Sequence, residues 1–415
     1  MIVPARACPA DADLRRYLTA RVVSVAGALV VAVALPVLAY RLTGSPAWTA
    51  AIAAAEAVPY LLLGLLAGAL ADRVDRRSVM VGCDLLTAAA LAAVPLGWWF
   101  DALTPWQLLG TAAVTQTAFV FFDAANFGAL PTLAGEDRLT EAWARLFGAT
   151  TLVELLVPPL AGLAIAVLAP AGLMVLAAVA AAGSAVLVRS VRGRLSPEPA
   201  SRMRTRVVAD VREGLGLVFG HPVVRTLTLV GTTQAVAGGA WAAMTVPWAD
   251  AVLGIRPAGD PRLGLLFACW GVGGLVAARV VPWLSSRWGG ARLALAALPV
   301  STACALAVCA STHWVPALLA ATAFGAAYTI VVLNAVTFRQ QVTPPHARAR
   351  VSTTARMLSW GVGTPAGAAL AGAVASTGAG PRGALLAGAL VLAFGVVVAW
   401  TGPALRTAAR VPLSS

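Results

Sequence analysis

Residues 60–83 read YLLLGLLAGALADRVDRRSVMVGC, a charged turn between two apolar runs. Extended outward, the runs cover residues 47–71 and 78–99. A helix that crosses the hydrocarbon core of a bilayer needs about 20 apolar residues, each adding about 1.5 Å of length. Because each run meets this length, the stretch predicts two membrane-spanning helices joined by a short charged turn.

The composition of the whole chain agrees with a bilayer environment. Of its 415 residues, 60% are hydrophobic and only 11% are charged, and the mean hydropathy is +0.84. Soluble domains carry charge at about a quarter of their positions. This chain has too few charges to cover a water-facing globule, which predicts that its apolar surface contacts the lipid bilayer.

The chemistry-bearing residues exclude several classes of function. The formal net charge is +13, but the arginines that carry it lie in short clusters between apolar runs, which argues against a nucleic-acid partner. No lysine occurs, so the P-loop sequence that binds ATP phosphates is absent. The cysteines form no CxxC pair, and the three histidines lie far apart. We therefore predict no metal site, no cofactor and no enzymatic activity.

Charge clusters and Pro or Gly turns divide the chain into twelve apolar stretches. All arginines except Arg41, Arg256, Arg262 and Arg382 fall on one side when these stretches alternate across the membrane. Arginine-rich loops stay in the cytoplasm, so we expect an inner (plasma) membrane protein with both termini cytoplasmic. The stretches cover residues 17–40, 47–71, 78–99, 106–131, 146–168, 171–189, 223–249, 263–284, 291–310, 314–338, 351–376 and 382–401.

The longest hydrophilic stretch, residues 189–225, follows the sixth apolar stretch and divides the chain into halves. We interpret it as a solvated linker with an amphipathic helix near residues 206–219. The halves share weak similarity in their small residues and prolines, a pattern found in transporter repeats, although packing alone would also explain it. These features predict an all-α membrane protein: an N-terminal six-helix bundle (1–190), a cytoplasmic linker (191–222) and a C-terminal six-helix bundle (223–415).

The charged turn resembles the signature of one transporter family. The run Gly68-Ala-Leu-Ala-Asp72-Arg73-Val-Asp75-Arg76-Arg77 is similar to the motif that the major facilitator superfamily carries between its second and third helices. The resemblance implies two pseudo-symmetric bundles that work by alternating access. It also implies that Asp72 faces the start of the eleventh helix, near residues 350–351, and locks the outward-facing state. The helix dipole stabilises a carboxylate at a helix N-terminus by about 0.3–2 kcal/mol.

Further short motifs are similar to a branch that contains siderophore exporters, such as the enterobactin exporter, and related drug-efflux proteins. They are Leu35-Pro36, Leu42-Thr43-Gly44-Ser45-Pro46, Pro59-Tyr60, Ala129-Leu130-Pro131 and Arg350-Val351-Ser352. The resemblance implies a monomeric secondary transporter that exports a small, partly hydrophobic drug, antibiotic or siderophore in exchange for protons. Such exporters often carry an Arg in the fourth helix and a Gly-Pro pair in the fifth, and this chain has neither there. These departures weaken the inference of proton antiport more than the inference of export. A nutrient importer and a non-transporting sensor stay open as alternatives.

Acidic residues within apolar stretches are candidates for carrying protons, because an ionised group at mid-helix costs about 2.5–3.5 kcal/mol on insertion scales. Glu56 is the leading candidate, since residues 51–59 hold no other charge. Burial without a partner disfavours the charged form, which suits reversible protonation. Its alternative role is to reach the outer headgroups.

Two further proton candidates are Glu154 and Asp123. Glu154 has an inter-helix hydrogen bond as its alternative role. The alternatives for Asp123 are capping of a helix end and pairing with Arg138 or Arg145. We interpret Asp84, in the third stretch, as structural.

The resemblance implies that helices 1, 2, 4, 5, 7, 8, 10 and 11 line the substrate cavity. Arg21 either snorkels to the surface or faces the cavity and meets Asp123 or Glu154. Mid-span amides either bind substrate or tie helices together. The cavity candidates are Arg21, Asn126, Gln234, Trp241 and Asn334. Proline within a span permits a bend, and the candidates for such bends are Pro36, Pro59, Pro159 and Pro365.

Overall fold

The computed structural model describes residues 9–71, 73–135, 138–196, 207–257, 259–343 and 348–410. Within these ranges the regular structure consists of helices alone. The first half contains α1 (Pro9–Thr43), α2 (Pro46–Ala71), α3 (Arg76–Trp99), α4 (Pro105–Ala134), α5 (Leu139–Val167) and α6 (Pro170–Ser190). The second contains α7 (Val207–Gly220), α8 (Pro222–Leu253), α9 (Pro261–Trp288), α10 (Gly290–Ala310), α11 (Trp314–Val342), α12 (Arg348–Arg356), η3 (Met357–Gly363), α13 (Thr364–Val374), η4 (Ala375–Ala379), α14 (Gly380–Thr401) and α15 (Pro403–Arg410).

Length and hydropathy identify ten helical segments of the described chain that can cross a membrane. The end of α7 and α8, bent by 102° at their junction, form a further candidate. One of the ten segments, Thr354–Thr401, covers 48 residues and reverses direction between α13 and α14, where Gly378 and Gly380 adopt φ values of 88° and 65°. Positive φ is accessible to glycine without steric penalty. With this reversal counted, the described residues contain segments for twelve passes, as the apolar stretches predicted.

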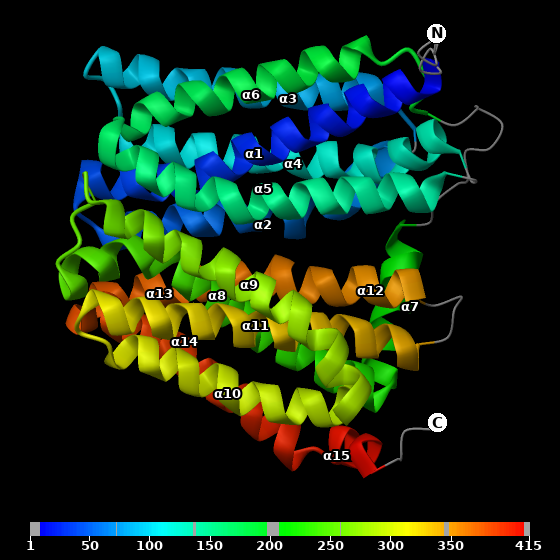
Figure 1. The fold of residues 1–415 in the computed structure, drawn as a ribbon, viewed down its shortest axis with the longest axis vertical. Coiled ribbons are helices and arrows are strands. Elements are labelled where there is room, and N and C mark those ends of the chain that lie inside the picture. Colours follow the sequence, from blue (N-terminus) through cyan, green and yellow to red (C-terminus); the bar gives the residue numbers. More distant parts are fainter. Residues whose placement is uncertain are drawn as a thin grey trace, which may run out of the picture.

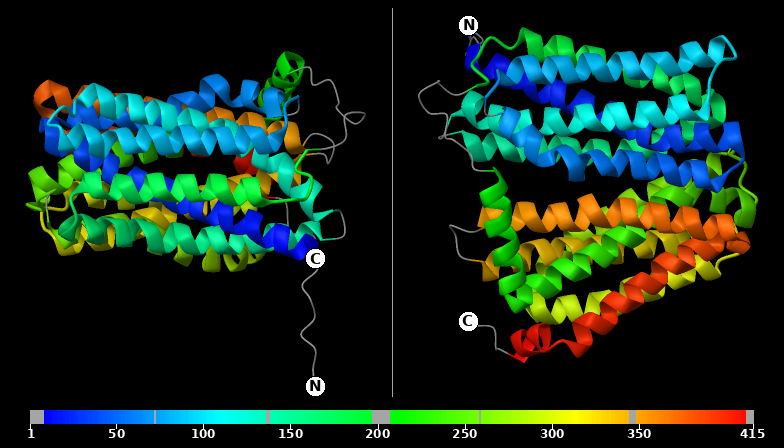
Figure 2. Two further views of the ribbon diagram at one scale, coloured as in Figure 1. Left: turned by 90° about the horizontal axis from the view of Figure 1, so that it is seen from above. Right: turned by 180° about the vertical axis from the view of Figure 1, so that it is seen from behind.

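The passes form two bundles that lie one above the other in Figure 1. In the N-terminal bundle, α6 packs on α1 and α3, and α4 packs on α2 and α3. In the C-terminal bundle, α11 packs on α9 and α10, and α14 packs on α8. Figure 2 shows α7 and α15 at the same end of the molecule as the start of α1. The predicted fold class is confirmed, whereas the division of the chain at residues 190 and 223 stays a prediction.

Local sequence signals explain where the helices begin. Several start with proline at the first position, where its missing N–H has no helical partner and its fixed φ suits the helix. Before α4, the Thr104 hydroxyl accepts a hydrogen bond from the backbone N–H of Gln107 (3.2 Å). Before α9, the Asp260 carboxylate accepts one from the N–H of Arg262 (3.0 Å). Each cap satisfies a backbone donor that the first turn leaves free.

The first helix is longer than its predicted span. α1 begins at Pro9 rather than at residue 17, because Leu14 is buried and the Asp13 carboxylate accepts hydrogen bonds from the N–H groups of Arg192 (3.0 Å) and Gly193 (2.6 Å). These contacts extend the helix beyond the apolar run and tie it to the segment after α6. The linker helix α7 lies where the amphipathic helix was predicted.

The predicted span 351–376 is built from α12, the π-helix η3 and α13 rather than from one regular helix. Proline cannot donate a helical hydrogen bond, and Pro365 follows directly after the π segment. The change of hydrogen-bond pattern adjusts the helix before the residue that would otherwise break it. The other predicted bend sites, Pro36, Pro59 and Pro159, lie inside α1, α2 and α5.

The two bundles approach most closely where α5 meets α9. A Cβ atom built on Gly162 would lie 2.2 Å from the Cα of Gly264, and one built on Gly264 would lie 2.6 Å from the backbone nitrogen of Leu163. Only glycine allows two helix backbones to meet at this distance. A second contact joins the bundles nearby, where the Tyr40 hydroxyl on α1 donates to the Asp250 carboxylate on α8 (3.0 Å). The bundles are therefore held together at this end, which the predicted orientation places on the outer side of the membrane.

Candidate functional site

A buried ion pair lies between α1 and α4. Arg21 Nη2 donates to Asp123 Oδ1 over 2.8 Å, and the two side chains are 10% and 14% exposed. The Arg21 guanidinium also lies over the rings of Phe119 (5.7 Å) and Phe122 (5.3 Å), which contributes a cation–π attraction. Arg21 thus meets Asp123, one of the two partners that the sequence offered. Such a pair keeps two charges inside the membrane because each compensates the other.

Asn126 lies beside this pair and is also buried. The Tyr17 hydroxyl donates to Asn126 Oδ1 over 2.6 Å. The contact connects α1 to α4 inside the N-terminal bundle. Asn126, predicted to contact substrate, is held in place by a neighbour in its own bundle.

Arg356 of α12 crosses to the N-terminal bundle. Its guanidinium donates to the Tyr60 hydroxyl on α2 and lies over the rings of Tyr60 (5.5 Å) and Phe127 (5.8 Å). Arg356 is exposed, so this contact is open to water or a solute. One signal for this contact exists in the sequence, because Pro59-Tyr60 is one of the motifs similar to the exporter branch, but no feature of the sequence paired Tyr60 with Arg356.

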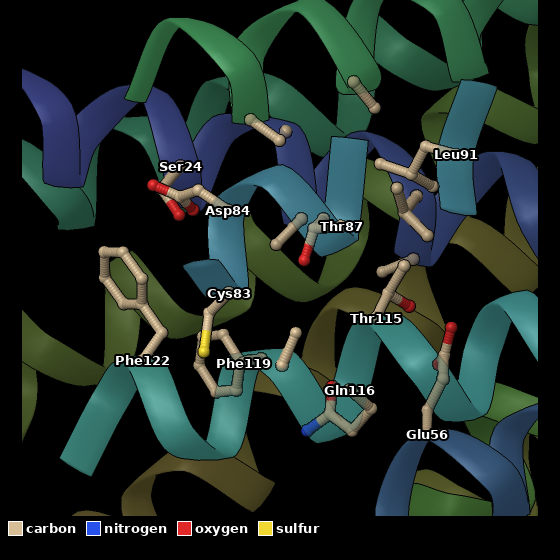
Figure 3. Close-up of a pocket in the computed structure, with 17 residues that line it drawn as sticks. Ser24, Glu56, Cys83, Asp84, Thr87, Leu91, Thr115, Gln116, Phe119 and Phe122 are labelled. Atoms are coloured by element: carbon tan, nitrogen blue, oxygen red, sulfur yellow. The ribbon is translucent and has the colours of Figure 1, made fainter. Parts of the chain in front are cut away.

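An internal pocket of about 120 Å³ lies within the N-terminal bundle. It is lined by side chains of α1, α2, α3, α4 and α6, among them Glu56 and Asp84. Figure 3 shows Glu56 entering from α2 and Asp84 from α3, with Thr87, Thr115 and Gln116 between them. The structure therefore places the leading proton candidate inside a bundle rather than among headgroups. Asp84, interpreted from sequence as structural, lines the same pocket.

The remaining acidic candidate, Glu154, lies on α5 and is exposed. Of the amide candidates, Gln234 is fully buried and its side-chain oxygen accepts from the Ser301 hydroxyl (3.3 Å), which ties α8 to α10. The Asn334 side chain donates to the backbone oxygen of Gly290 (2.9 Å), which ties α11 to α10. Both amides occupy the helix-tying role that the sequence left open beside substrate contact.

Trp241 lies in an aromatic cluster inside the C-terminal bundle. Its ring centroid is 5.9 Å from that of Trp248, 6.2 Å from Trp270 and 6.3 Å from Phe324. Tyr328 extends the cluster, 4.7 Å from Trp270. Aromatic pairs at these separations stabilise packing beyond the area that they bury. The cluster fixes α8, α9 and α11 against one another.

The charged turn between α2 and α3 anchors one end of the N-terminal bundle. Arg76 is buried and donates to the backbone oxygen of Gly128 (2.8 Å) on α4, where a Cβ atom would lie 2.2 Å from the guanidinium carbon. Arg77 donates to the backbone oxygen of Gly193 (2.6 Å), which follows α6. Arg73 is exposed, Gly68 lies in the last part of α2, and Asp72 lies outside the described residues. The predicted contact of Asp72 with the eleventh helix stays a prediction.

Asp75 caps the N-terminus of α3. Its carboxylate accepts from the Ser78 backbone N–H (3.0 Å) and hydroxyl (2.9 Å), and from the Ser196 hydroxyl (3.1 Å) beyond α6. Burial alone would raise the pKa of Asp75, but these hydrogen bonds and the Arg77 charge outweigh it and lower the pKa. A lowered pKa means that the charged form is favoured in the folded protein.

We expect Asp75→Ala to lower the free energy of unfolding by about 1 kcal/mol, the usual loss for a helix cap. Because the pKa of Asp75 is lowered on folding, its contribution is present above the pKa of the unfolded chain and is lost as the pH falls through the folded value. Thermal unfolding of the purified protein should therefore separate variant from wild type at neutral pH and not in strong acid. Glu141→Ala, which removes an exposed carboxylate, is the control; equal effects of both variants would contradict the capping role.

Taken together, the described residues place carboxylates in two settings. Asp123 is compensated by Arg21, whereas Glu56 and Asp84 face a shared pocket. No group of three or more His, Cys, Asp or Glu side chains within the described ranges has metal-binding geometry. The chemistry that these carboxylates offer is the binding and release of protons.

Comparisons with known proteins give one consistent answer. The Major Facilitator Superfamily profile matches residues 17–359. The multidrug efflux pump Tap of Mycolicibacterium fortuitum is 30% identical over 400 residues, which cover 92% of this chain and 93% of that protein. The macrolide efflux protein A of Streptococcus pyogenes is 23% identical over 175 residues, which cover 42% of this chain and 43% of that protein.

Solved structures share the fold. A bacterial homologue of the human lysosomal transporter Spinster, in an inward-facing and unoccupied conformation, superposes with a TM-score of 0.77 at 13% identity. The superposition covers 99% of this chain and 100% of that one. At this identity the likeness shows the fold alone.

Proposed function

The chain belongs to the major facilitator superfamily, and we propose that it exports small, partly hydrophobic drugs or antibiotics by alternating access in exchange for protons. It acts as a monomer in the plasma membrane, with both termini in the cytoplasm. Siderophores remain the alternative cargo from the sequence motifs. The substrates named for the relatives favour drugs.

The observation that carries this proposal is the full-length similarity to a multidrug efflux pump. The match extends over 92% of the chain, so it includes both bundles rather than one shared segment. A second efflux protein is similar over a shorter region. Export of drugs is the function that these relatives support in common.

The structure supports proton coupling through its acidic residues. Glu56 lines the internal pocket and has no ion-pair partner among the described residues. A carboxyl in such a setting is neutral when protonated but carries an uncompensated charge when ionised. Binding of a proton therefore removes the large free-energy cost of a buried charge. A change of charge at this place is a means of linking the proton gradient to movement of the bundles.

We expect Glu56→Gln to reduce proton-driven efflux to background. Everted membrane vesicles that acidify their interior by respiration should accumulate ethidium when they contain the wild-type protein, and should release it when a protonophore is added. Vesicles with Glu56→Gln should behave as vesicles without the protein, because a glutamine cannot carry the proton. The readout is the quenching of ethidium fluorescence.

The matched control is Glu141→Gln, which neutralises an exposed carboxylate at the cytoplasmic end of α5. This variant should accumulate ethidium as the wild type does. The amount and the size-exclusion profile of each variant must match those of the wild type. Undiminished accumulation by a folded Glu56→Gln variant would remove Glu56 from the mechanism, and uptake by intact cells in place of efflux would reverse the proposed direction.

A further inference from the structure

The pocket inside the N-terminal bundle has the size and lining of a hydrated site. A buried water needs about 10–15 Å³ of such space and two to four polar partners. The pocket volume of about 120 Å³ therefore accommodates several waters. Its polar lining includes Ser24 on α1, Thr87 on α3, and Thr115 and Gln116 on α4.

Asp84 presents an unsatisfied oxygen in this pocket. The residue is 4% exposed, and its Oδ2 atom has no hydrogen-bond partner among the described residues. Buried polar atoms are normally paired, and an unpaired one indicates a missing water, ion or proton. The side chain lines the pocket wall, and Oδ2 itself is almost fully shielded from solvent.

The helices around Asp84 supply little positive charge. From α1, Arg21 is the nearest cation, and it is already paired with Asp123 of α4. From α2 comes Glu56, and from α3 itself comes the thiol of Cys83. The side chains that α6 contributes to the pocket are alanines, Ala177 and Ala181. Among the described residues that line the pocket, two carboxyls therefore occur without a basic side chain.

The arrangement of the two carboxyls suits a proton better than a metal ion. The described residues contain no cluster with metal-binding geometry, and the two carboxyls enter the pocket from different helices at separate places. A metal ion needs several oxygens converging on one point. A proton needs one carboxyl oxygen and a chain of hydrogen-bonding groups, which the threonine hydroxyls and water in a pocket of this size would supply.

We propose that Asp84, together with Glu56, forms a proton-binding site inside the N-terminal bundle, separate from the surface where the two bundles meet. Binding forms an O–H bond at Asp84 Oδ2 and removes its negative charge; release returns the proton to a pocket water. The proposal deepens the proposed function and rests on it only for the use of the proton in export. It assigns to Asp84 a role that its position in the third helix did not suggest.

Infrared difference spectroscopy of the full-length protein in lipid tests proton binding without any transport. When the pH is raised, the wild-type spectrum should lose the C=O band of protonated carboxyls. Asp84→Asn should lack one component of this change, and Glu56→Gln should lack another. Glu141→Gln, an exposed carboxyl outside the pocket, should retain both components.

A second measurement connects the site to export. In proteoliposomes, Asp84→Asn should abolish ethidium movement driven by a pH gradient, yet should retain exchange of ethidium down its own gradient. Asp84→Glu restores a carboxyl and should recover part of the gradient-driven flux. If Asp84→Asn fails to fold, Asp84→Glu takes its place in the infrared experiment and should shift the position of the assigned component.

The outcomes separate the two proposals. The proton-binding site is overturned if Asp84→Asn shows the same infrared change as the wild type. It is also overturned if Asp84→Glu does not shift the position of any component. Both conclusions hold whatever the protein transports. If Asp84→Asn loses its infrared component but the wild type moves no ethidium under a pH gradient, the proton-binding site is supported and proton-coupled export is overturned. Loss of both gradient-driven and downhill flux in a folded Asp84→Asn variant with a complete infrared change marks Asp84 as structural.

Discussion

Arg21→Ala should abolish efflux and lower the free energy of unfolding by about 3–5 kcal/mol, the usual loss when one member of a buried ion pair is removed. The pair with Asp123 is 2.8 Å long, and the arginine side chain is only 10% exposed. Without Arg21, the Asp123 carboxylate would be charged and uncompensated inside the membrane. The measurement is the thermal stability of the purified protein, followed by size-exclusion chromatography.

A double variant distinguishes stability from function at this pair. Arg21→Met with Asp123→Leu removes both charges and keeps apolar bulk beside Phe119 and Phe122. Replacement of a complete buried pair by apolar side chains is often neutral or stabilising. We therefore expect the double variant to regain stability but not efflux. Wild-type stability of Arg21→Ala alone would show that the pair contributes nothing to folding.

The bundle architecture was predictable from sequence because the bilayer imposes it. Apolar stretches of sufficient length and the one-sided distribution of arginine are properties of composition along the chain, and they do not depend on how helices rotate. The charged turn at residues 68–77 was likewise recognisable, since its residues act at one place in the sequence. The differences lie at the start of α1, which extends back to Pro9, and in the span 351–376, where a π segment precedes Pro365.

The contacts within the site were less predictable, because they depend on the direction in which each helix faces. Arg21 and Asp123 are 102 residues apart, and the sequence offered Glu154, Arg138 and Arg145 as other partners for them. The rotation of a helix in a membrane is decided by packing against its neighbours, which a single sequence does not specify. For the same reason, Gln234 was a candidate for substrate contact although it ties α8 to α10.

Asp84 illustrates the limit of an argument from position. The third helix is not among those that the resemblance implies line the cavity, and the carboxyl on it was interpreted as structural. In the structure, α3 packs on α4 and α6 and turns Asp84 towards the pocket that Glu56 also lines. A signal did exist, because an acidic residue within an apolar stretch is costly wherever the helix lies.

Gly264→Val should abolish transport by separating the outer ends of the bundles. A Cβ atom at Gly264 would lie 2.6 Å from the backbone nitrogen of Leu163 and 2.7 Å from the carbonyl carbon of Gly162. Both neighbours are backbone atoms, so they cannot move aside as a flexible side chain would, and the helices α5 and α9 must part. Alternating access requires the outer end to close in one state, and the variant loses that state.

The measurement is the labelling of a single cysteine placed at Ala50, in a variant without the native cysteines. Ala50 is 3% exposed and lies against Gly372 of the other bundle. A membrane-impermeant maleimide added from outside should label it faster in Gly264→Val than in the unchanged background. Gly110→Val is the control, because a Cβ atom at Gly110 meets nothing within 4 Å. If labelling and ethidium efflux were both unchanged in Gly264→Val, the contact of α5 with α9 would not be the closure of the outer end.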